Sequence, residues 1–212
     1  GGGGRQIALL PADGSAGPAK VAPAMGPQEY GLYPAPSRDG KWIVFGRTQA
    51  TTGTDIFAMD RTRGNQVREI YVAPGAQAFP SLSPDGRYVL YQGQETGLDE
   101  IHVRTFPVPS GHWQLTAKGG VRPKWSAKGD RIFFIQDDVL MEVEVRVNPS
   151  FSFGTPRPIF ALEGNPAFQG AYDVAPDGRT FAMIREVETG RFGPRTMTFV
   201  EHWDQELQRR RK

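Results

Sequence analysis

Residues Phe79–Phe106 read FPSLSPDGRYVLYQGQETGLDEIHVRTF, and this stretch decides the fold. A short strand ends at the turn Ser83–Gly86, an apolar run Tyr88–Tyr91 follows, and a polar loop Gln92–Asp99 leads to a further strand at Ile101–Phe106. The Asp-Gly pair favours a tight turn, because glycine accepts a positive φ and aspartate bonds to its own backbone. The stretch therefore predicts a module of antiparallel strands.

The same pattern recurs along the chain. The turn glycines Gly40, Gly86, Gly129 and Gly178 follow one another at intervals of 46, 43 and 49 residues. The third to fifth residues after each glycine are apolar in every copy: Ile43–Phe45, Val89–Tyr91, Ile132–Phe134 and Phe181–Met183. Because these runs do not alternate apolar with polar residues, both faces of each strand are expected to be buried. A repeat of this length predicts an all-β chain of propeller blades, each a four-stranded antiparallel sheet.

The turn residues are assigned a structural role. They are Asp39 and Gly40, Asp85 and Gly86, and Asp177 and Gly178. In the third copy Lys128 stands where the others have aspartate, and Asp130 follows the glycine. A turn of a different type is therefore expected there.

The repeat also predicts how the chain is divided. We expect an outer half-blade and linker at 1–32, then blades at 33–72, 79–116, 122–160 and 171–203, and a short helix with a basic tail at 204–212. The result is a partial propeller of about four blades. The first prolines of the blades, Pro34, Pro80 and Pro123, fall at the start of the innermost strand, where a lost backbone donor is tolerated.

Several motifs resemble a known family. The turn Ser83–Gly86, the apolar strand behind it, and the Gly-x-Asp lead at Gly53–Ile56 and Gly97–Ile101 resemble TolB-type, WD-like β-propeller repeats. The runs at 111–134, 154–160 and 172–184, and the ending TMTFVEHWDQEL, resemble the last blades of bacterial propellers fused behind serine/threonine kinase domains. The resemblance implies a C-terminal fragment of a six-bladed propeller, and it favours a periplasmic or other extracytoplasmic location.

Composition argues against several classes of function. The 25 basic and 23 acidic residues nearly balance, so a nucleic-acid partner is not expected. The chain has no cysteine, which excludes disulfides and thiolate metal sites. No apolar run reaches the roughly 18–20 residues of a membrane span, so direct membrane insertion is not expected. No cofactor is predicted.

No catalytic residue is predicted either. Ser81 and Ser83 do not lie in a Gly-x-Ser-x-Gly motif, and the glycine-rich, His-Arg-Asp and Asp-Phe-Gly signatures of kinases are missing. His102, His112 and His202 are separated in the sequence, and no metal site is predicted from them.

Binding is expected at the starts of the first strands. Tyr33, Phe79, Arg122 and Tyr172 lie there, and aromatic residues and arginine are favoured at binding hot spots. Our hypothesis is that Arg122 and Tyr172 contact the ligand or partner. The alternative is that all four residues only pack the inner ring of the propeller.

Three functions fit these observations. The first is a non-catalytic recognition, sensor or scaffold module, the C-terminal part of a bacterial serine/threonine kinase-linked protein. The alternatives are a TolB-like periplasmic binding protein, or a propeller that gates a peptidase domain outside this chain. The protein or small-molecule partner is unknown. Self-association through exposed blade edges is a further expectation, because open repeat arrays leave strand edges unpaired.

Overall fold

The computed structural model describes residues 7–10, 13–15, 19–20, 31–162, 172–185 and 196–200 of the chain. The predicted helix and basic tail at 204–212 lie outside these residues. The chain divides into two compact units, Gly1–Gly119 and Gly120–Lys212. Each unit is described by itself below.

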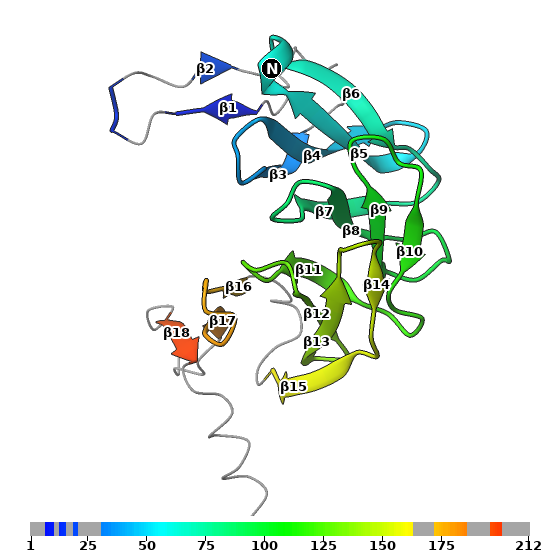
Figure 1. The fold of residues 1–212 in the computed structure, drawn as a ribbon, viewed down its shortest axis with the longest axis vertical. Coiled ribbons are helices and arrows are strands. Elements are labelled where there is room, and N and C mark those ends of the chain that lie inside the picture. The colour runs from blue at the N-terminus through cyan, green and yellow to red at the C-terminus, as the bar shows by residue number, and fades with distance from the viewer. Residues whose placement is uncertain are drawn as a thin grey trace, which may run out of the picture. The chain divides into compact units, whose positions relative to one another are not determined.

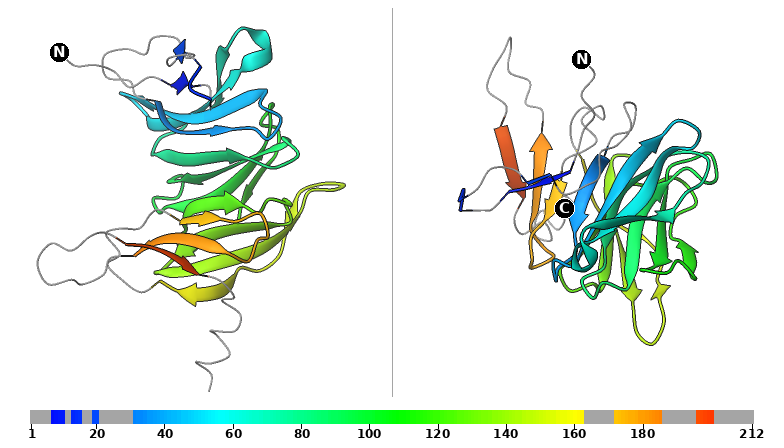
Figure 2. Two further views of the ribbon diagram at one scale, coloured as in Figure 1. Left: turned by 90° about the vertical axis from the view of Figure 1, so that its left-hand side faces the viewer. Right: turned by 90° about the horizontal axis from the view of Figure 1, so that it is seen from above.

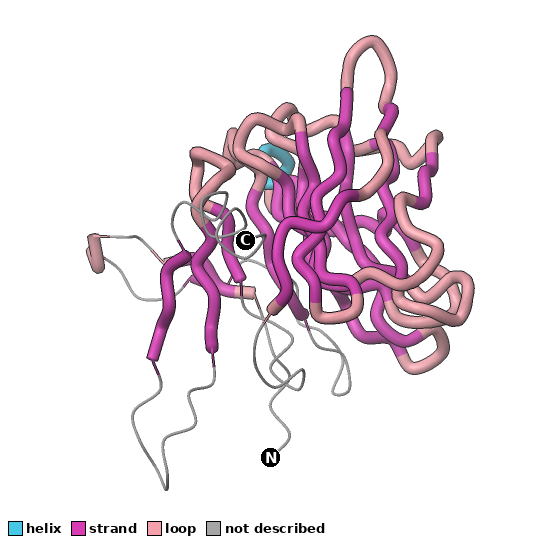
Figure 3. The backbone as a smooth tube through the Cα atoms, turned by 90° about the horizontal axis from the view of Figure 1, so that it is seen from below, coloured by secondary structure: helices cyan, strands magenta, loops and turns pink. Residues whose placement is uncertain are grey.

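The described chain is built almost entirely from β-strands. Its one helical element is a short 3-10 helix, η1 (Arg61–Arg63), drawn in cyan among the magenta strands of Figure 3. No helix in the described ranges is long and apolar enough to cross a membrane. The predicted all-β class is confirmed.

The first unit contains two four-stranded antiparallel sheets, shown from blue to green in Figure 1. One is formed in order by β3 (Gly31–Pro36), β4 (Trp42–Gln49), β5 (Gly53–Asp60) and β6 (Gln66–Tyr71). The other is formed by β7 (Gln77–Leu82), β8 (Tyr88–Gly93), β9 (Glu100–Thr105) and β10 (His112–Gln114). A separate two-stranded ladder joins β1 (Ala8–Leu9) to β2 (Ala19–Lys20).

The second unit repeats the pattern with one addition. Its first sheet holds β11 (Val121–Trp125), β12 (Arg131–Gln136), β13 (Val139–Arg146) and β15 (Arg157–Ala161). The sequence did not predict β14 (Ser152–Phe153), which pairs with the end of β13 and projects as a hairpin in Figure 2. The last sheet has three strands, β16 (Tyr172–Val174), β17 (Phe181–Arg185) and β18 (Thr196–Val200).

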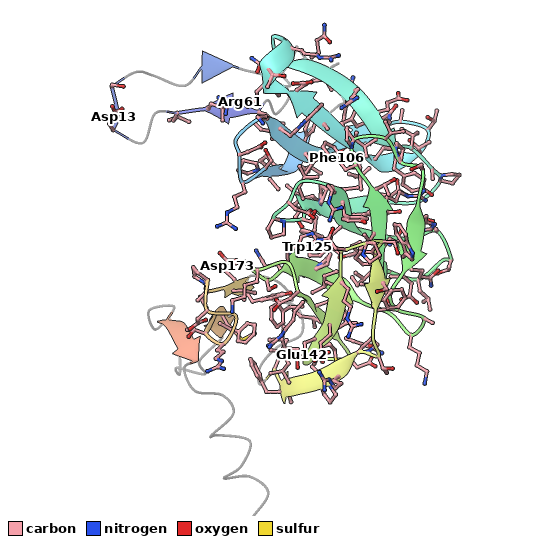
Figure 4. The ribbon with its side chains drawn as sticks, in the orientation of Figure 1. Asp13, Arg61, Phe106, Trp125, Glu142 and Asp173 are labelled. Atoms are coloured by element: carbon pink, nitrogen blue, oxygen red, sulfur yellow. The ribbon has the colours of Figure 1, made fainter. Side chains whose placement is uncertain are left out.

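The second strands β4, β8 and β12 are buried on both faces, as their unbroken apolar runs predict, whereas in β17 Phe181 is buried and Ala182 and Met183 are half-buried. In β4, Val44 belongs to a core shared with the neighbouring sheet, where it joins Val89 and Tyr91. Its neighbours Ile43 and Phe45 belong to a different core on the other face of the same sheet. At the border between the two sheets, Phe106 (labelled in Figure 4) meets the ring of Trp42 edge-on at 5.1 Å. Burial from both sides makes each sheet depend on its neighbours.

The turns between first and second strands share one backbone hydrogen bond, and the first two also share a bond from a serine hydroxyl to an aspartate. In the first sheet Gly40 N donates to Ser37 O at 2.9 Å, and Ser37 Oγ donates to Asp39 Oδ1 at 2.7 Å. The second sheet repeats this with Ser83 Oγ and Asp85 Oδ1 at 2.6 Å. The glycines have φ values of 66–74° in all four copies, a region that residues with a Cβ avoid.

The third turn keeps this geometry with a different carboxylate. Gly129 N donates to Ser126 O at 3.0 Å, as in the other copies. Ser126 Oγ donates to Asp130 Oδ1 at 2.8 Å, so the residue after the glycine supplies the acceptor that Lys128 cannot. The third turn was expected to differ in type, but it keeps the backbone hydrogen bond of the other copies. Asp130, after the glycine, replaces the aspartate that precedes the glycine in those copies.

Candidate functional site

Each of the strands β3, β7 and β11 contains a β-bulge at the same position. The pairing shifts between Leu32 and Ala35, between Ala78 and Ser81, and between Val121 and Lys124. In each case the extra residue falls at an X-Pro pair, where X is Tyr33, Phe79 or Arg122. Bulges bend the strand and re-aim a side chain, and they are common beside binding sites.

The residue before proline at each bulge has a left-handed backbone. The φ angles are 53° for Tyr33, 53° for Phe79 and 58° for Arg122. The other described non-glycine residues with positive φ are Asn65, Asp137 and Asp138, residue types that tolerate this region in turns. Bulky residues do so at a cost of about 1–2 kcal/mol. The fold therefore holds three large side chains in an unfavourable conformation at one repeated position.

In the first unit, two of these side chains meet. The Tyr33 and Phe79 ring centroids lie 4.0 Å apart with their planes tilted by 41°. Tyr33 is 40% exposed and Phe79 is half-buried, so the pair presents aromatic surface to solvent. Gly46 on β4 makes room for Thr54, because a Cβ there would lie 2.9 Å from Thr54 Cγ2, whereas Tyr33 Cδ2 would lie at an ordinary contact distance of 3.6 Å.

In the second unit, Arg122 is joined to Tyr172. The Tyr172 hydroxyl donates to the Arg122 carbonyl oxygen at 2.8 Å, which fixes the backbone of the bulge. Lys124 Nζ pairs with Asp173 Oδ1 at 3.1 Å, next to this contact (Asp173 is labelled in Figure 4). Burial raises the pKa of Tyr172 well above its ordinary value, so the hydroxyl keeps its proton and remains a donor.

The four predicted residues thus have two different placements. Tyr33, Phe79 and Arg122 occupy the bulge position, whereas Tyr172 occupies the position of the prolines in the other copies and is only 5% exposed. Ala171, at the bulge position of the fourth copy, lies outside the described residues. Tyr172 supports Arg122 in the structure and offers little surface of its own.

Buried carboxylates anchor the third strands. Asp55 Oδ1 accepts from Ala73 N at 3.1 Å, and its Oδ2 accepts from Gln49 Nε2 at 3.0 Å and from the Thr52 hydroxyl. In the next sheet Glu100, rather than the neighbouring Asp99, does this through Gly119 N at 3.1 Å and the Thr116 hydroxyl. Both oxygens of each carboxylate therefore accept hydrogen bonds that hold these loops.

A second polar cluster lies on the β8–β10 side of the first unit. Glu95, in the loop after β8, accepts a hydrogen bond from the Tyr91 hydroxyl on Oε1 at 2.7 Å. Arg104 Nη2 lies 3.5 Å from the same oxygen, and Arg104 Nε donates to the Tyr91 hydroxyl at 2.8 Å. The Arg104 guanidinium also lies 3.6 Å from the centre of the Tyr71 ring. One oxygen of Glu95 is therefore held from two sides.

Two histidines complete this cluster. His102 Nδ1 and His112 Nε2 lie 3.0 Å apart, and His112 Nε2 lies 3.7 Å from Glu95 Oε2. Burial lowers the pKa of both imidazoles, and the charge of Arg104 lowers that of His112 further. Burial raises the pKa of Glu95, but the hydrogen bond from Tyr91 and the neighbouring positive charges outweigh it and the net shift is downward. The favoured charge state is two neutral imidazoles beside one carboxylate.

The sequence pattern did not indicate that these two histidines come together. They are ten positions apart on β9 and β10, and the ladder pairs His102 with Gln114 and His112 with Arg104. Only this register places the two rings diagonally on one face. Strands can be predicted from the sequence, but the register of a hairpin with a long loop cannot. The ten-residue spacing of His102 and His112 therefore did not indicate their contact.

Comparison with known proteins supports the fold. No family model matches the chain. A 138-residue segment is 28% identical to an uncharacterized protein, Atu1656, of Agrobacterium fabrum, and the match covers 62% of this chain and 47% of that protein. The chain thus spans about half the length of this relative.

Similarity to solved structures also supports the fold. TolB from Acinetobacter baumannii matches with a TM-score of 0.65 at 18% identity, over 86% of this chain and 43% of that one. The Dos1 propeller matches with a TM-score of 0.57 at 13% identity, over 84% of this chain and 44% of that one. A lyase and peptidases are also similar, so the fold alone does not separate binding from catalysis. With its repeated antiparallel sheets, the chain has the β-propeller fold.

Proposed function

We propose that the chain is a non-catalytic recognition module that binds a protein or small ligand at the bulge position, through Tyr33 and Phe79 in the first unit and through Arg122 in the second. The observation that carries this proposal is the left-handed backbone at the same bulge in three sheets. Strained residues of this kind persist only where the surroundings hold them, and they cluster at binding sites. Partly exposed aromatic side chains and arginine on a rigid scaffold supply binding energy efficiently.

The serine and histidine candidates for catalysis fit this proposal. Ser81 Oγ is buried and has no hydrogen-bond partner within the described ranges, so no base is placed to activate it. His102 is paired with His112 instead. We expect no phosphotransfer, protease or esterase activity from this chain alone. Turnover of a fluorogenic peptide or ester that Ser81→Ala or His102→Ala abolishes would contradict the proposal.

For the whole protein we favour a bacterial serine/threonine kinase-linked protein whose C-terminal part is this propeller, outside the cytoplasm. The motifs of the third and fourth blades support that assignment. The likeness to TolB supports a TolB-like periplasmic binding protein as the second candidate. Both candidates use the chain for recognition, whereas a propeller that gates a peptidase domain would restrict access to another site.

The experiment needs a ligand that the chain itself selects. A phage library of random short peptides is panned against the folded chain, and amide hydrogen exchange is compared with and without the selected peptide. We expect new protection at the starts of β3, β7 and β11. Protection confined to the turns at Asp39, Asp85 and Asp177 would place recognition elsewhere and overturn the proposed site.

A further inference from the structure

The cluster formed by Glu95, His102 and His112 contains none of the bulge residues, and the proposed recognition does not use it. It joins the β8–β9 loop to β9 and β10, and β10 is a three-residue strand whose one ladder is with β9. We propose that this cluster is a binding site for a divalent transition-metal ion of the zinc class, held by His102 Nδ1, His112 Nε2 and Glu95 Oε2.

The spacing of the three atoms suits one ion. All three donors lie within 4.8 Å of one another, and the closest pair, His102 Nδ1 and His112 Nε2, is 3.0 Å apart. Two ligands at about 2.0–2.1 Å from a tetrahedral Zn²⁺ lie roughly 3.4 Å apart, so the side chains need to move only slightly. Two imidazoles and one carboxylate are a donor set that zinc takes in proteins, with a water molecule in the remaining position.

The surroundings prepare the three donors. Tyr91 and Arg104 occupy Oε1 of Glu95, which leaves Oε2 toward His112. His102 is fully buried and stacks on Tyr91, with ring centroids 5.3 Å apart. A Cβ at Gly93 would lie 3.2 Å from His102 Cδ2, so glycine makes room for this ring.

The site is open on one side. The His112 side chain is 34% exposed and that of Glu95 is 17% exposed, whereas His102 lies beneath them. An ion therefore enters past His112. Once bound, it would tie β10 and the Glu95 loop to β9, and so stabilise the outer edge of the second sheet. The competing interpretation is a plain hydrogen bond between the two imidazoles.

Zinc binding by the full chain tests the proposal. The affinity for Zn²⁺ is measured by competition with a chromophoric chelator, and Co²⁺ is added as a spectroscopic probe of tetrahedral coordination. We expect one ion per chain, a melting temperature that rises with Zn²⁺ because the ion binds the folded state, and the visible absorption of tetrahedral Co²⁺.

Single substitutions locate the ion. His112→Ala and Glu95→Gln are made at partly exposed positions, which keeps the buried His102 and the fold intact. Each should weaken Zn²⁺ binding at least about 100-fold, because loss of a direct ligand costs more than loss of its supporting partner. The matched controls are Gln114→Ala on the same strand and His202→Ala, and both should bind as the unaltered chain does.

Three results would overturn the site. The first is no Zn²⁺ binding by the unaltered chain above that of His112→Ala. The second is an equal loss of affinity in His202→Ala, which would indicate a different set of ligands. The third is a Co²⁺ complex without tetrahedral absorption.

Discussion

At the scale of the residue, the unusual feature is a large side chain with a left-handed backbone. Tyr33, Phe79 and Arg122 share it, and nothing in their chemistry favours it. The X-Pro pair was visible in the sequence, and proline disfavours the right-handed helical region for the residue before it. The left-handed φ was not predictable, because it arises from the bulge that the neighbouring strand imposes.

Because Tyr33 has a positive φ, glycine should be a more stable replacement than alanine at this position, the reverse of the usual order in a strand. Tyr33→Gly should be more stable to urea than Tyr33→Ala by about 1 kcal/mol, since glycine accepts positive φ and alanine does not. Ala35, on the same strand but without positive φ, is the control, and Ala35→Gly should lose about 0.5–1 kcal/mol. A Tyr33→Ala variant as stable as Tyr33→Gly would show that the bulge carries no strain.

The turn carboxylates offer a second test for single residues. A hydrogen bond from Ser37 and one from the Lys41 amide lower the pKa of Asp39 to about 2. The folded value lies below the unfolded one, so the stabilising contribution is present above pH about 4 and is lost as the pH falls through about 2. Ser37→Ala should raise the pKa of Asp39 toward 3.8, as followed by carboxyl NMR titration.

Asp177 is the internal control for that titration. Backbone amides of Arg179 and Thr180 and the Thr180 hydroxyl lower its pKa, and no serine contributes. Its pKa should therefore be the same in Ser37→Ala as in the unaltered chain. An Asp39 pKa that stays near 2 in the variant would assign the shift to the Lys41 amide alone.

At the scale of the element, the turns and second strands were predictable because their causes are local. Asp-Gly fixes the turn, and the unbroken apolar run predicts burial from both sides, as Val44 and Phe45 show. The hairpin strand β14 and the pairing of His102 with His112 were not predictable. Both depend on which residues lie opposite one another, and the sequence does not encode that register locally.

In the third turn, Asp130 should have the role that Asp39 and Asp85 have in the first two turns. Asp130→Ala should destabilise the chain by about 1 kcal/mol, because it leaves Ser126 Oγ without its acceptor. Lys128→Ala, two positions earlier, should change stability by less than about 0.5 kcal/mol. Chemical unfolding gives the loss of stability in each variant. Equal losses would refute the claim that Asp130 takes over the role of the aspartate at the Lys128 position.

At the scale of the whole molecule, the sheets of both units repeat one pattern, and the proposed recognition uses one position that recurs in three of them. The fold follows from the four copies of the turn and agrees with the likeness to TolB and to the Dos1 propeller. The boundaries of the blades stay a prediction, and the partner and the link to a kinase are proposals that rest on the sequence motifs and the bulge residues. The repeated sheets could be predicted from the sequence, because the turns and apolar runs that produce them recur along the chain.

The affinity of a peptide selected by the chain tests the central claim most directly. Calorimetry compares the unaltered chain with Tyr33→Ala, Phe79→Ala and Arg122→Ala, and with the turn variants Asp39→Asn and Asp85→Asn as controls. We expect each bulge variant to bind about fivefold more weakly, a loss of about 1 kcal/mol, and the turn variants to bind as the unaltered chain does. Unchanged binding by the folded bulge variants, with a loss in either turn variant, would contradict it.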